Sequence, residues 1–373
     1  MATYKEIKGL TVQNLSADPT LNAGTEGQVW FNSTSGKLKG LVAISAWSSG
    51  TICNTARRLR TGFGTQDAGT MAFGYGPGAG VFNAEEFNGS AWSTGGTSPT
   101  PLTANDEGSD QVGTTGSSGL SAGGYRNSPA GSLANTNEYD GTSWSGGGAL
   151  PGARIGGIGG CGSVAAGAVF GGAPPPSYTT TCDEYASSTW TNVNGLNTAR
   201  GYMAGCGTQS TGLAVGGGTS PTGGTTTVEE YDATSWATGG TLPTANTKMG
   251  AAGNSGDAIS YMGITTAPST GTTNSQTYDG SAWTAAASLA IGGFTAGHFG
   301  TSTAAVCAAG IETGNPPTSP GGGGYTNQTQ LFNKDIFIRL PGAWASGGTL
   351  GTGRQNGSGM GISTAALVAG GEV

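Results

Sequence analysis

The segment Tyr139-Asp-Gly-Thr-Ser-Trp144 places an aromatic residue five positions before a tryptophan, and closely similar phrases recur along the chain. The others are Phe87-Asn-Gly-Ser-Ala-Trp92, Tyr185-Ala-Ser-Ser-Thr-Trp190, Tyr231-Asp-Ala-Thr-Ser-Trp236 and Tyr278-Asp-Gly-Ser-Ala-Trp283. Together with Trp47 and Trp344, these tryptophans follow one another at intervals of 45, 52, 46, 46, 47 and 61 residues. A repeat of about 40–50 residues with one such hairpin in each unit is typical of β-propeller blades.

The unit between Trp144 and Trp190 predicts four strands. Strand a covers residues 155–161 and is built of small residues, strand b covers 165–170 and is apolar, and strands c and d cover 183–185 and 188–190. Four antiparallel strands make one propeller blade, with strand a lining the narrow axis. Strand alternation then places the b–c loops and d–a connectors on one face, the long-loop face. The a–b and c–d turns lie on the opposite, short-turn face.

The c–d turns have residues suited to tight hairpins. Asn88-Gly89, Asp140-Gly141 and Asp279-Gly280 stand between the aromatic residue and the tryptophan. Such pairs accept the positive φ of type I′ turns, so we expect these acidic residues to form turns and not to act in catalysis.

The units resemble kelch-type repeats, in which an apolar strand and a Gly-Gly pair precede a spaced Tyr and Trp. The Gly-Gly pair is clear at Gly123-Gly124, Gly171-Gly172, Gly216-Gly217 and Gly370-Gly371. The resemblance covers about residues 26–373 and implies an all-β propeller of four-stranded antiparallel blades.

The chain ends predict how the ring closes. Residues 345–373 supply only strands a and b of a last unit, and residues 28–47 supply a matching c and d pair that ends at Trp47. We therefore expect a seven-bladed β-propeller in which N-terminal strands complete the C-terminal blade, because closure removes open sheet edges.

Composition excludes several function classes. The net charge is −7, and the largest basic cluster is Arg57-Arg58-Leu-Arg60, so no stripe exists that could neutralise nucleic-acid phosphates. No run approaches the length of a membrane-spanning helix, and the polar start is not a secretory signal. Five cysteines without CxxC spacing predict buried reduced thiols, and the single histidine, His298, argues against a metal or cofactor site.

Carboxylates recur in pairs just before the aromatic residue of strand c, as in Glu85-Glu86, Asp183-Glu184 and Glu229-Glu230. Arginines recur just before strand a, at Arg57, Arg154, Arg200 and Arg354. Because an enzyme needs one special pair, the repetition favours structural bonds between Arg and either Glu or a carbonyl group. The alternative is a ring of arginines that grips an anionic ligand. We predict that the chain is not an enzyme.

The long-loop face is the candidate binding surface. Tyr75, Tyr125, Tyr178 and Tyr325 lie on Pro-, Gly- and Thr-rich loops, and tyrosine gives contact area at low entropic cost. The alternative is a set of ordinary surface loops.

Residues 1–25 stand outside the repeat as an N-terminal arm, followed by the propeller over 26–373. The phrase Gly27-Gln-Val-Trp-Phe-Asn-Ser-Thr-Ser-Gly-Lys-Leu38 is similar to a segment near the start of tail-fibre and other virion structural proteins of marine tailed bacteriophages. The likeness implies a virion protein that is assembled in the host cytoplasm without a signal peptide. The arm would bind other virion proteins or mediate homo-oligomerisation, and the long-loop face would bind a host surface glycan or protein. The alternatives are a cellular protein- or glycan-binding scaffold and, less favoured, a carbohydrate-active enzyme.

Overall fold

The computed structural model describes residues 13–20, 22, 28–58, 61–97, 112–127, 130–173, 177–219, 223–265, 271–312, 324–341, 358–362 and 365–369. The chain divides into two compact units, one of Ala43–Ile336 and one of Met1–Val42 with Phe337–Val373. The first of these is an all-β propeller of four-stranded antiparallel blades. The expected division into an arm of residues 1–25 and a propeller over 26–373 stays a prediction.

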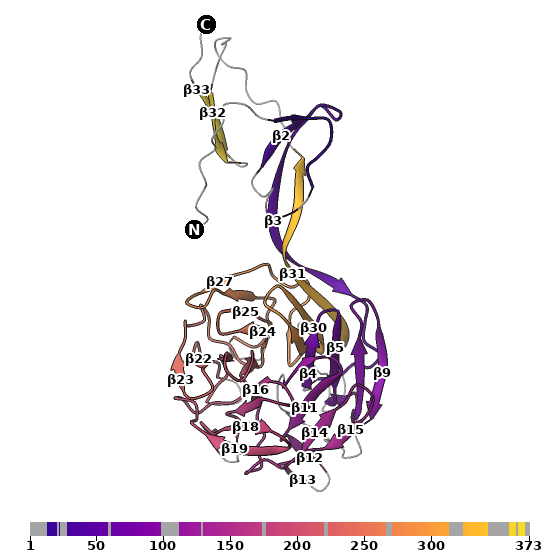
Figure 1. Ribbon diagram of the computed structural model, residues 1–373, viewed down its shortest axis with the longest axis vertical. Helices are drawn as coiled ribbons and strands as arrows, with labels where there is room; N and C mark the ends of the chain where they lie inside the picture. The colour runs from indigo at the N-terminus through magenta and orange to yellow at the C-terminus, as the bar shows by residue number, and fades with distance from the viewer. Residues whose placement is uncertain are drawn as a thin grey trace. The chain divides into compact units, whose positions relative to one another are not determined.

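Five blades are separate four-stranded sheets with their strands in sequence order. From inner to outer strand, the first blade contains β4 (Thr61–Thr65), β5 (Ala68–Ala72), β8 (Asn83–Phe87) and β9 (Trp92–Thr97), and the second contains β10 (Val112–Thr115), β11 (Ser118–Ala122), β14 (Thr136–Tyr139) and β15 (Trp144–Gly146). The third contains β16 (Gly159–Gly162), β17 (Gly167–Phe170), β18 (Cys182–Ala186) and β19 (Thr189–Val193), and the fourth contains β20 (Ala204–Cys206), β21 (Gly212–Val215), β22 (Val228–Tyr231) and β23 (Trp236–Thr238). The fifth contains β24 (Gly250–Asn254), β25 (Asp257–Tyr261), β26 (Ser275–Tyr278) and β27 (Trp283–Ala285). Figure 1 shows β4, β16 and β24 near the centre of the ring and β9, β19, β23 and β27 at its rim.

The aromatic residue and the tryptophan of each c–d hairpin are direct cross-strand partners, as in Tyr139 with Trp144 and Tyr185 with Trp190. Ring centroids in the five hairpins are 4.6 to 4.9 Å apart. The predicted turn type is wrong where Asp-Gly occurs, because in Asp140-Gly141 only the glycine has a positive φ, of 91°. Asp140 instead accepts the backbone N–H groups of Thr142 and Ser143 and closes a four-residue turn.

The sixth position of the ring is filled by a mixed sheet. Its propeller part contains β29 (Gly297–Gly300), β30 (Ala304–Glu312), β31 (Tyr325–Pro341) and β3 (Lys37–Gly50), and β28 (Gly293–Phe294) also pairs with β30. The outer strand therefore comes from the N-terminal side of the chain. Trp47 packs 5.3 Å from Phe332, as the other tryptophans do on their Tyr or Phe, and its Nε1 donates to Ser275 Oγ of the fifth blade at 3.3 Å.

The expected seventh blade is not formed by the described residues. N-terminal residues do close the ring, but on β31 and not on the C-terminal strands, which pair with each other as β32 (Ser358–Ile362) and β33 (Ala365–Ala369). The inner strand β29 lies against β4 of the first blade, where a Cβ at Gly62 would be 2.5 Å from the carbonyl oxygen of His298. That contact leaves no space for another blade between them. Trp344 lies outside the described residues.

Crowding of the inner strands explains their small residues. A Cβ added at Gly205 of β20 would lie 2.4 Å from the backbone nitrogen and oxygen of Gly160 in the neighbouring β16. Side chains larger than hydrogen are excluded there, which confirms the expected small-residue strand a.

The second unit contains a short sheet in which β1 (Gln13–Leu15) runs parallel to β2 (Val29–Asn32), and β2 runs antiparallel to β3. Asp18 accepts hydrogen bonds from Trp30 Nε1 at 3.1 Å, Asn32 Nδ2 at 2.6 Å and Lys39 Nζ at 2.8 Å. The bond from Lys39 is the main reason that the pKa of Asp18 falls to about 2.

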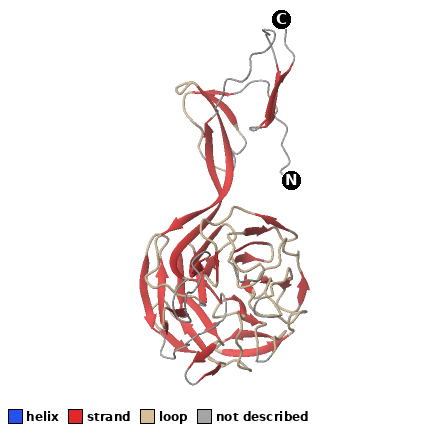
Figure 2. Cartoon of the chain, turned by 180° about the vertical axis from the view of Figure 1, so that it is seen from behind, coloured by secondary structure: helices blue, strands red, loops and turns tan. Residues whose placement is uncertain are grey.

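The two faces of the propeller are as expected. Backbone bridges join b–c segments to d–a connectors at Arg58 with Tyr75, Ile155 with Ala173, and Gly201 with Gly218. The short hairpins β6 (Tyr75–Gly76) with β7 (Ala79–Gly80), and β12 (Tyr125–Asn127) with β13 (Ala130–Ser132), belong to this long-loop face. Figure 2 shows the described residues as strands and loops. The described residues include no helix that could cross a membrane.

Candidate functional site

The structure places all four predicted tyrosines in b–c segments or at the start of a following strand, and each is partly buried. Tyr75 begins β6, Tyr125 begins β12, Tyr178 lies between β17 and β18, and Tyr325 begins β31. Three of them belong to two separate clusters, which we name the Tyr178 cluster and the Tyr325 cluster. Among the described residues, Tyr125 contributes to neither.

The Tyr178 cluster consists of Tyr178, Tyr202 and Lys248. The rings of Tyr178 and Tyr202 meet edge to face with centroids 6.1 Å apart, and Lys248 Nζ lies 4.8 Å above the ring of Tyr202. A cation in this position is attracted by the negative face of the ring. The ring of Tyr178 also lies over Gly201, where a Cβ would be 2.5 Å from Cε1 of the tyrosine. The cluster therefore joins the third, fourth and fifth blades with fixed geometry.

The backbone of this cluster follows a repeated and unusual conformation. Tyr202, Lys248 and Thr295 occupy equivalent positions just before β20, β24 and β29, with φ of 55°, 57° and 55°. The amide of Tyr202 donates to Gly156, that of Lys248 donates to Tyr202, and that of Thr295 donates to Lys248, at 2.8 to 3.1 Å. A left-handed conformation costs a non-glycine residue about 1–2 kcal/mol. We name this hydrogen-bonded series of Tyr202, Lys248 and Thr295 the collar, and it lies at the long-loop end of the inner strands. Its hydrogen bonds hold the backbone in a conformation that a free chain rarely adopts.

The Tyr325 cluster contains Arg58, Tyr75 and Tyr325, from the connector between the sixth and first blades and from their b–c segments. The guanidinium carbon of Arg58 lies 5.6 Å from the centre of the Tyr325 ring, and the centroids of Tyr75 and Tyr325 are 6.4 Å apart. The backbones of Arg58 and Tyr75 exchange hydrogen bonds at 2.9 and 3.0 Å. The same chemistry, two tyrosines and one cation, is thus built at another place on the long-loop face.

The predicted Glu–Arg bonds are confirmed, and they make the first acid of each pair structural. Buried ion pairs join Arg57 to Glu85, Arg154 to Asp183, and Arg200 to Glu229, each within one blade. Burial lowers the pKa of the three arginines, and the adjacent carboxylates oppose this effect. The alternative ring of ligand-gripping arginines is wrong for these three residues. Arg354 lies outside the described residues.

The second acid of each pair links neighbouring blades, a role that the sequence analysis did not predict. Tyrosine hydroxyls donate to the carboxylate of the preceding blade in four pairs, which are Tyr139 with Glu86, Tyr185 with Glu138, Tyr231 with Glu184, and Tyr278 with Glu230. Burial, followed by the bond to Glu86, raises the pKa of Tyr139 to about 12. These carboxylates are engaged in structure, so their repetition carries no sign of acid–base catalysis.

His298 and the cysteines are also parts of the packed ring. His298 lies on β29, only 5% exposed, and its ring meets Tyr261 edge to face at 6.5 Å. All five cysteines are buried free thiols, as expected. In the described part of the chain, no group of three or more His, Cys, Asp and Glu side chains is arranged to hold a metal ion.

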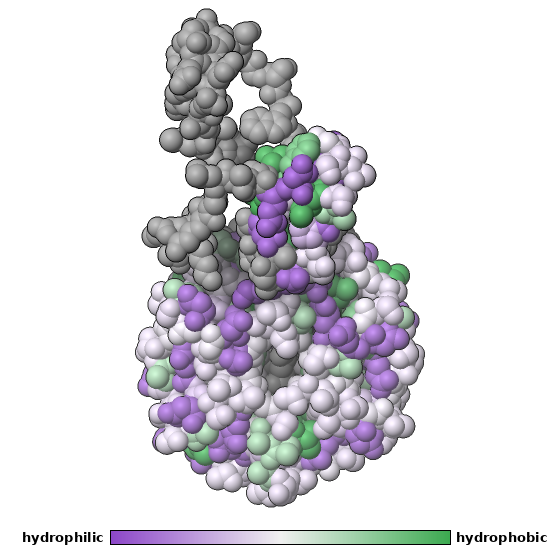
Figure 3. All heavy atoms as spheres, turned by 45° about the horizontal axis from the view of Figure 1, so that its top comes forward, coloured by the Kyte–Doolittle hydropathy of each residue, from purple (hydrophilic) through white to green (hydrophobic). Residues whose placement is uncertain are grey.

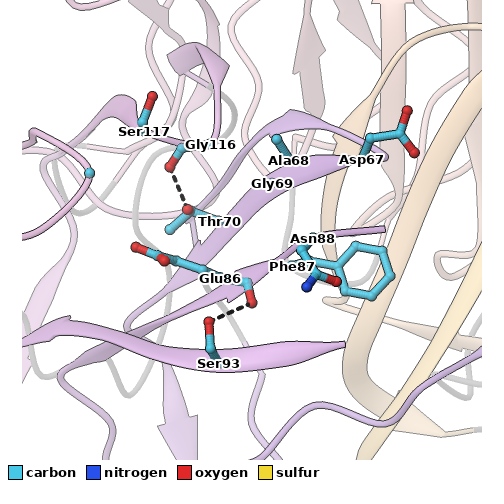
Figure 4. Close-up of a pocket in the computed structure, with 11 residues that line it drawn as sticks. Asp67, Ala68, Gly69, Thr70, Glu86, Phe87, Asn88, Ser93, Gly116 and Ser117 are labelled. Carbon is cyan, nitrogen blue, oxygen red and sulfur yellow. Dashed lines mark hydrogen bonds between the residues drawn. The ribbon is translucent and has the colours of Figure 1, made fainter. Parts of the chain in front are cut away.

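The short-turn face contains a pocket of about 240 Å³ between the first and second blades. Asp67, Glu86, Asn88 and Ser93 are among its polar lining residues (Figure 4). Its polar groups are largely engaged, because Glu86 accepts the hydroxyl of Tyr139 and Thr70 donates to the Gly116 carbonyl at 2.6 Å. Its aromatic residue, Phe87, is buried and offers no exposed ring. The pocket therefore suits a ligand less well than the two tyrosine clusters do.

The surface of the propeller that faces the viewer in Figure 3 is hollowed at the centre of the ring and is mostly of near-neutral hydropathy. This agrees with a chain that contains 74 glycines and is only 9% charged. On such a surface, a charged side chain beside an aromatic ring, as in the Tyr178 and Tyr325 clusters, differs from its surroundings. A scan against protein-family models gave no match, and a search of curated proteins found no similar sequence.

Proposed function

We propose that this chain is a non-enzymatic binding propeller and a structural component of a tailed-bacteriophage virion, with its long-loop face as the contact surface. The observation that carries the binding role is the pair of tyrosine–cation clusters on that face. The arginines and first acids are engaged in ion pairs within blades, and the second acids bond to tyrosines of the next blade. Tyr178, Tyr202 and Lys248, in contrast, differ from their counterparts in other blades. Residues that depart from the repeat are the ones available for recognition.

The virion assignment rests on the likeness of residues 27–38 to segments of virion structural proteins. The Gly-, Thr- and Ser-rich repeat body, which is only 9% charged, also suits a virion surface protein. The second unit, which contains both chain ends, would attach the propeller to other virion proteins or mediate homo-oligomerisation. The alternative is a cellular scaffold that binds protein or glycan through the same face. A cellular scaffold would not be a component of virus particles, so the presence or absence of the chain in purified virions distinguishes the two proposals.

Mass spectrometry of purified particles tests the virion role. Stoichiometric presence of the chain is expected, and its absence from particles of the producing phage would leave the scaffold as the better proposal. A glycan array tests the face separately, with Tyr178→Ala and Tyr325→Ala as variants. Asp232→Ala, on an exposed c–d turn of the opposite face, is the matched control. If neither tyrosine variant changed binding, recognition would lie elsewhere.

A further inference from the structure

The described charges of the propeller are divided between its two faces. Five acidic residues lie at the a–b and c–d turns of the short-turn face, at Asp67, Asp140, Asp232, Asp257 and Asp279. On the long-loop face, Glu312 is the only acidic residue among those described, apart from the acids paired with buried arginines. Arg58 and Lys248 give that face positive charge. Glu312 lies next to Ile311, the strand partner of Tyr325, and its backbone N–H donates to Gly324. The other exposed acids described in the propeller therefore lie away from the tyrosine clusters, and Glu312 is the exception.

Both cations lie beside aromatic rings. Lys248 Nζ lies over Tyr202 and the Arg58 guanidinium over Tyr325, and a cation–π contact of this kind stabilises each position by about 0.5–1 kcal/mol at an exposed site. The Nε atom of Arg58 is buried and has no hydrogen-bond partner among the described residues. The remaining N–H groups of a guanidinium, and the ammonium of a lysine, bind carboxylate, sulfate or phosphate groups by charge-assisted hydrogen bonds. Because these contacts already restrict the two side chains, less conformational entropy is lost when a ligand binds to them.

We infer that the ligand of the long-loop face is an acidic saccharide, whose anionic groups pair with Lys248 and Arg58 while sugar rings contact Tyr178 and Tyr75. This inference rests on the proposed binding function and specifies its ligand class. A nucleic acid would require a continuous basic stripe, which two isolated cations do not supply. A partly exposed tyrosine ring offers a rigid apolar surface and a hydroxyl, which suit the mixed C–H and hydroxyl surface of a sugar.

Binding of the purified full-length chain to three polymers tests the inference. The probes are polygalacturonate, dextran sulfate and unmodified dextran, immobilised at equal mass. We expect binding to the two acidic polymers and not to dextran. Binding should weaken as ionic strength rises from about 0.05 M to about 0.5 M, because the Debye length then shortens severalfold. Comparable binding to dextran, or no binding to either acidic polymer, overturns the inference.

Variants locate the interaction. Lys248→Gln and Arg58→Gln should each weaken binding to the acidic polymers about tenfold, which corresponds to the loss of one charge-assisted hydrogen bond. Lys334→Gln is the matched control, because it removes a lysine that lies 3.7 Å from Asp257 near the short-turn face. Circular dichroism verifies that each variant is folded. If Lys248→Gln and Arg58→Gln bound like the unmodified chain, the inference would be wrong.

The outcomes distinguish this inference from the proposed function. A chain that is present in virions and binds only neutral glycans through the long-loop face retains the proposed function and refutes the acidic ligand. A chain that binds acidic polymers but is absent from virions retains the ligand class and refutes the virion role.

Discussion

The buried Arg200–Glu229 ion pair of the fourth blade can be exchanged for the neutral residues that the fifth blade carries at the same positions. Arg200 and Asn246 each stand four residues before the inner strand, and Glu229 and Gln276 are each the second residue of strand c. The side chains of Arg200 and Glu229 are 0% and 2% exposed. The chain therefore offers its own template for the double substitution Arg200→Asn with Glu229→Gln.

Each single substitution should be costly because it leaves a buried charge without its counterion. Glu229→Gln leaves the guanidinium of Arg200 with neutral acceptors such as the Gly216 carbonyl at 2.9 Å. Arg200→Asn leaves the carboxylate with backbone donors such as the N–H of Asn197 at 2.6 Å. Breaking a buried ion pair from one side costs about 3–5 kcal/mol. The double variant removes both charges and should cost only about 1–3 kcal/mol, mainly through the volume lost at Asn.

Urea unfolding followed by tryptophan fluorescence measures the four members of this double-mutant cycle. We expect the double variant to be more stable than either single variant, with an unchanged dependence on urea concentration. If the two single costs simply added in the double variant, the charges would not interact as the structure indicates, and the reasoning would be refuted. Lys334→Gln, which breaks a partly exposed pair, should cost less than about 1 kcal/mol in the same assay.

Three further predictions concern closure, crowding and the links between blades. Trp47→Ala should lower the free energy of unfolding by about 3–5 kcal/mol. Ile44→Ala, at a 38% exposed position of the same strand, should change it by no more than about 0.5 kcal/mol. If urea unfolding showed similar effects for the two variants, β3 would not be a strand of the propeller. Gly201→Ala should cost about 1–3 kcal/mol, because its Cβ would meet the backbone at 2.3 Å, while Gly152→Ala, with no atom within 4 Å, should leave the unfolding midpoint unchanged. Tyr139→Phe should reduce the loss of unfolding free energy that occurs at alkaline pH. Burial raises the pKa of this phenol to about 12 from its ordinary value of 10. The contribution of the Tyr139 hydroxyl to stability is therefore complete below pH 10 and is lost as pH rises from 10 to 12. A variant as sensitive to alkali as the unmodified chain would contradict this assignment.

The blade architecture could be predicted because it depends on local chemistry that recurs. The aromatic–tryptophan hairpin, the small-residue inner strand and the unequal faces follow from residues close together in the sequence, and all three are present. The number of blades could not be obtained this way, because it depends on which distant strand covers the last sheet edge. Phe332 stands 12 residues before Trp344, whereas the other hairpins have a separation of five. That anomaly is the signal that Phe332 has another partner, which the structure shows to be Trp47.

The candidate site was predictable only in part. Tyr75, Tyr178 and Tyr325 were expected from loop composition and lie in the two clusters, whereas Tyr125, which was also expected, lies in neither. Tyr202 and Lys248 were not expected, because a left-handed tyrosine or lysine has no local sequence signature. Gly157, with φ of 64°, holds the equivalent position in the third blade, and glycine adopts this left-handed conformation readily.

The links between blades explain why the second carboxylate of each pair recurs with a tyrosine of the next blade. At the junction of the fifth and sixth blades, Thr277 replaces the second acid and Phe332 replaces its tyrosine. At the junction of the sixth and first blades, Leu331 and Phe87 stand in those positions. The carboxylate and the tyrosine hydroxyl are thus absent at the same junctions. This is expected if each is the hydrogen-bond partner of the other, because a buried donor or acceptor without a partner is destabilising. We therefore assign the proposed recognition role to residues that vary between blades, which on the long-loop face include Tyr178, Tyr202 and Lys248.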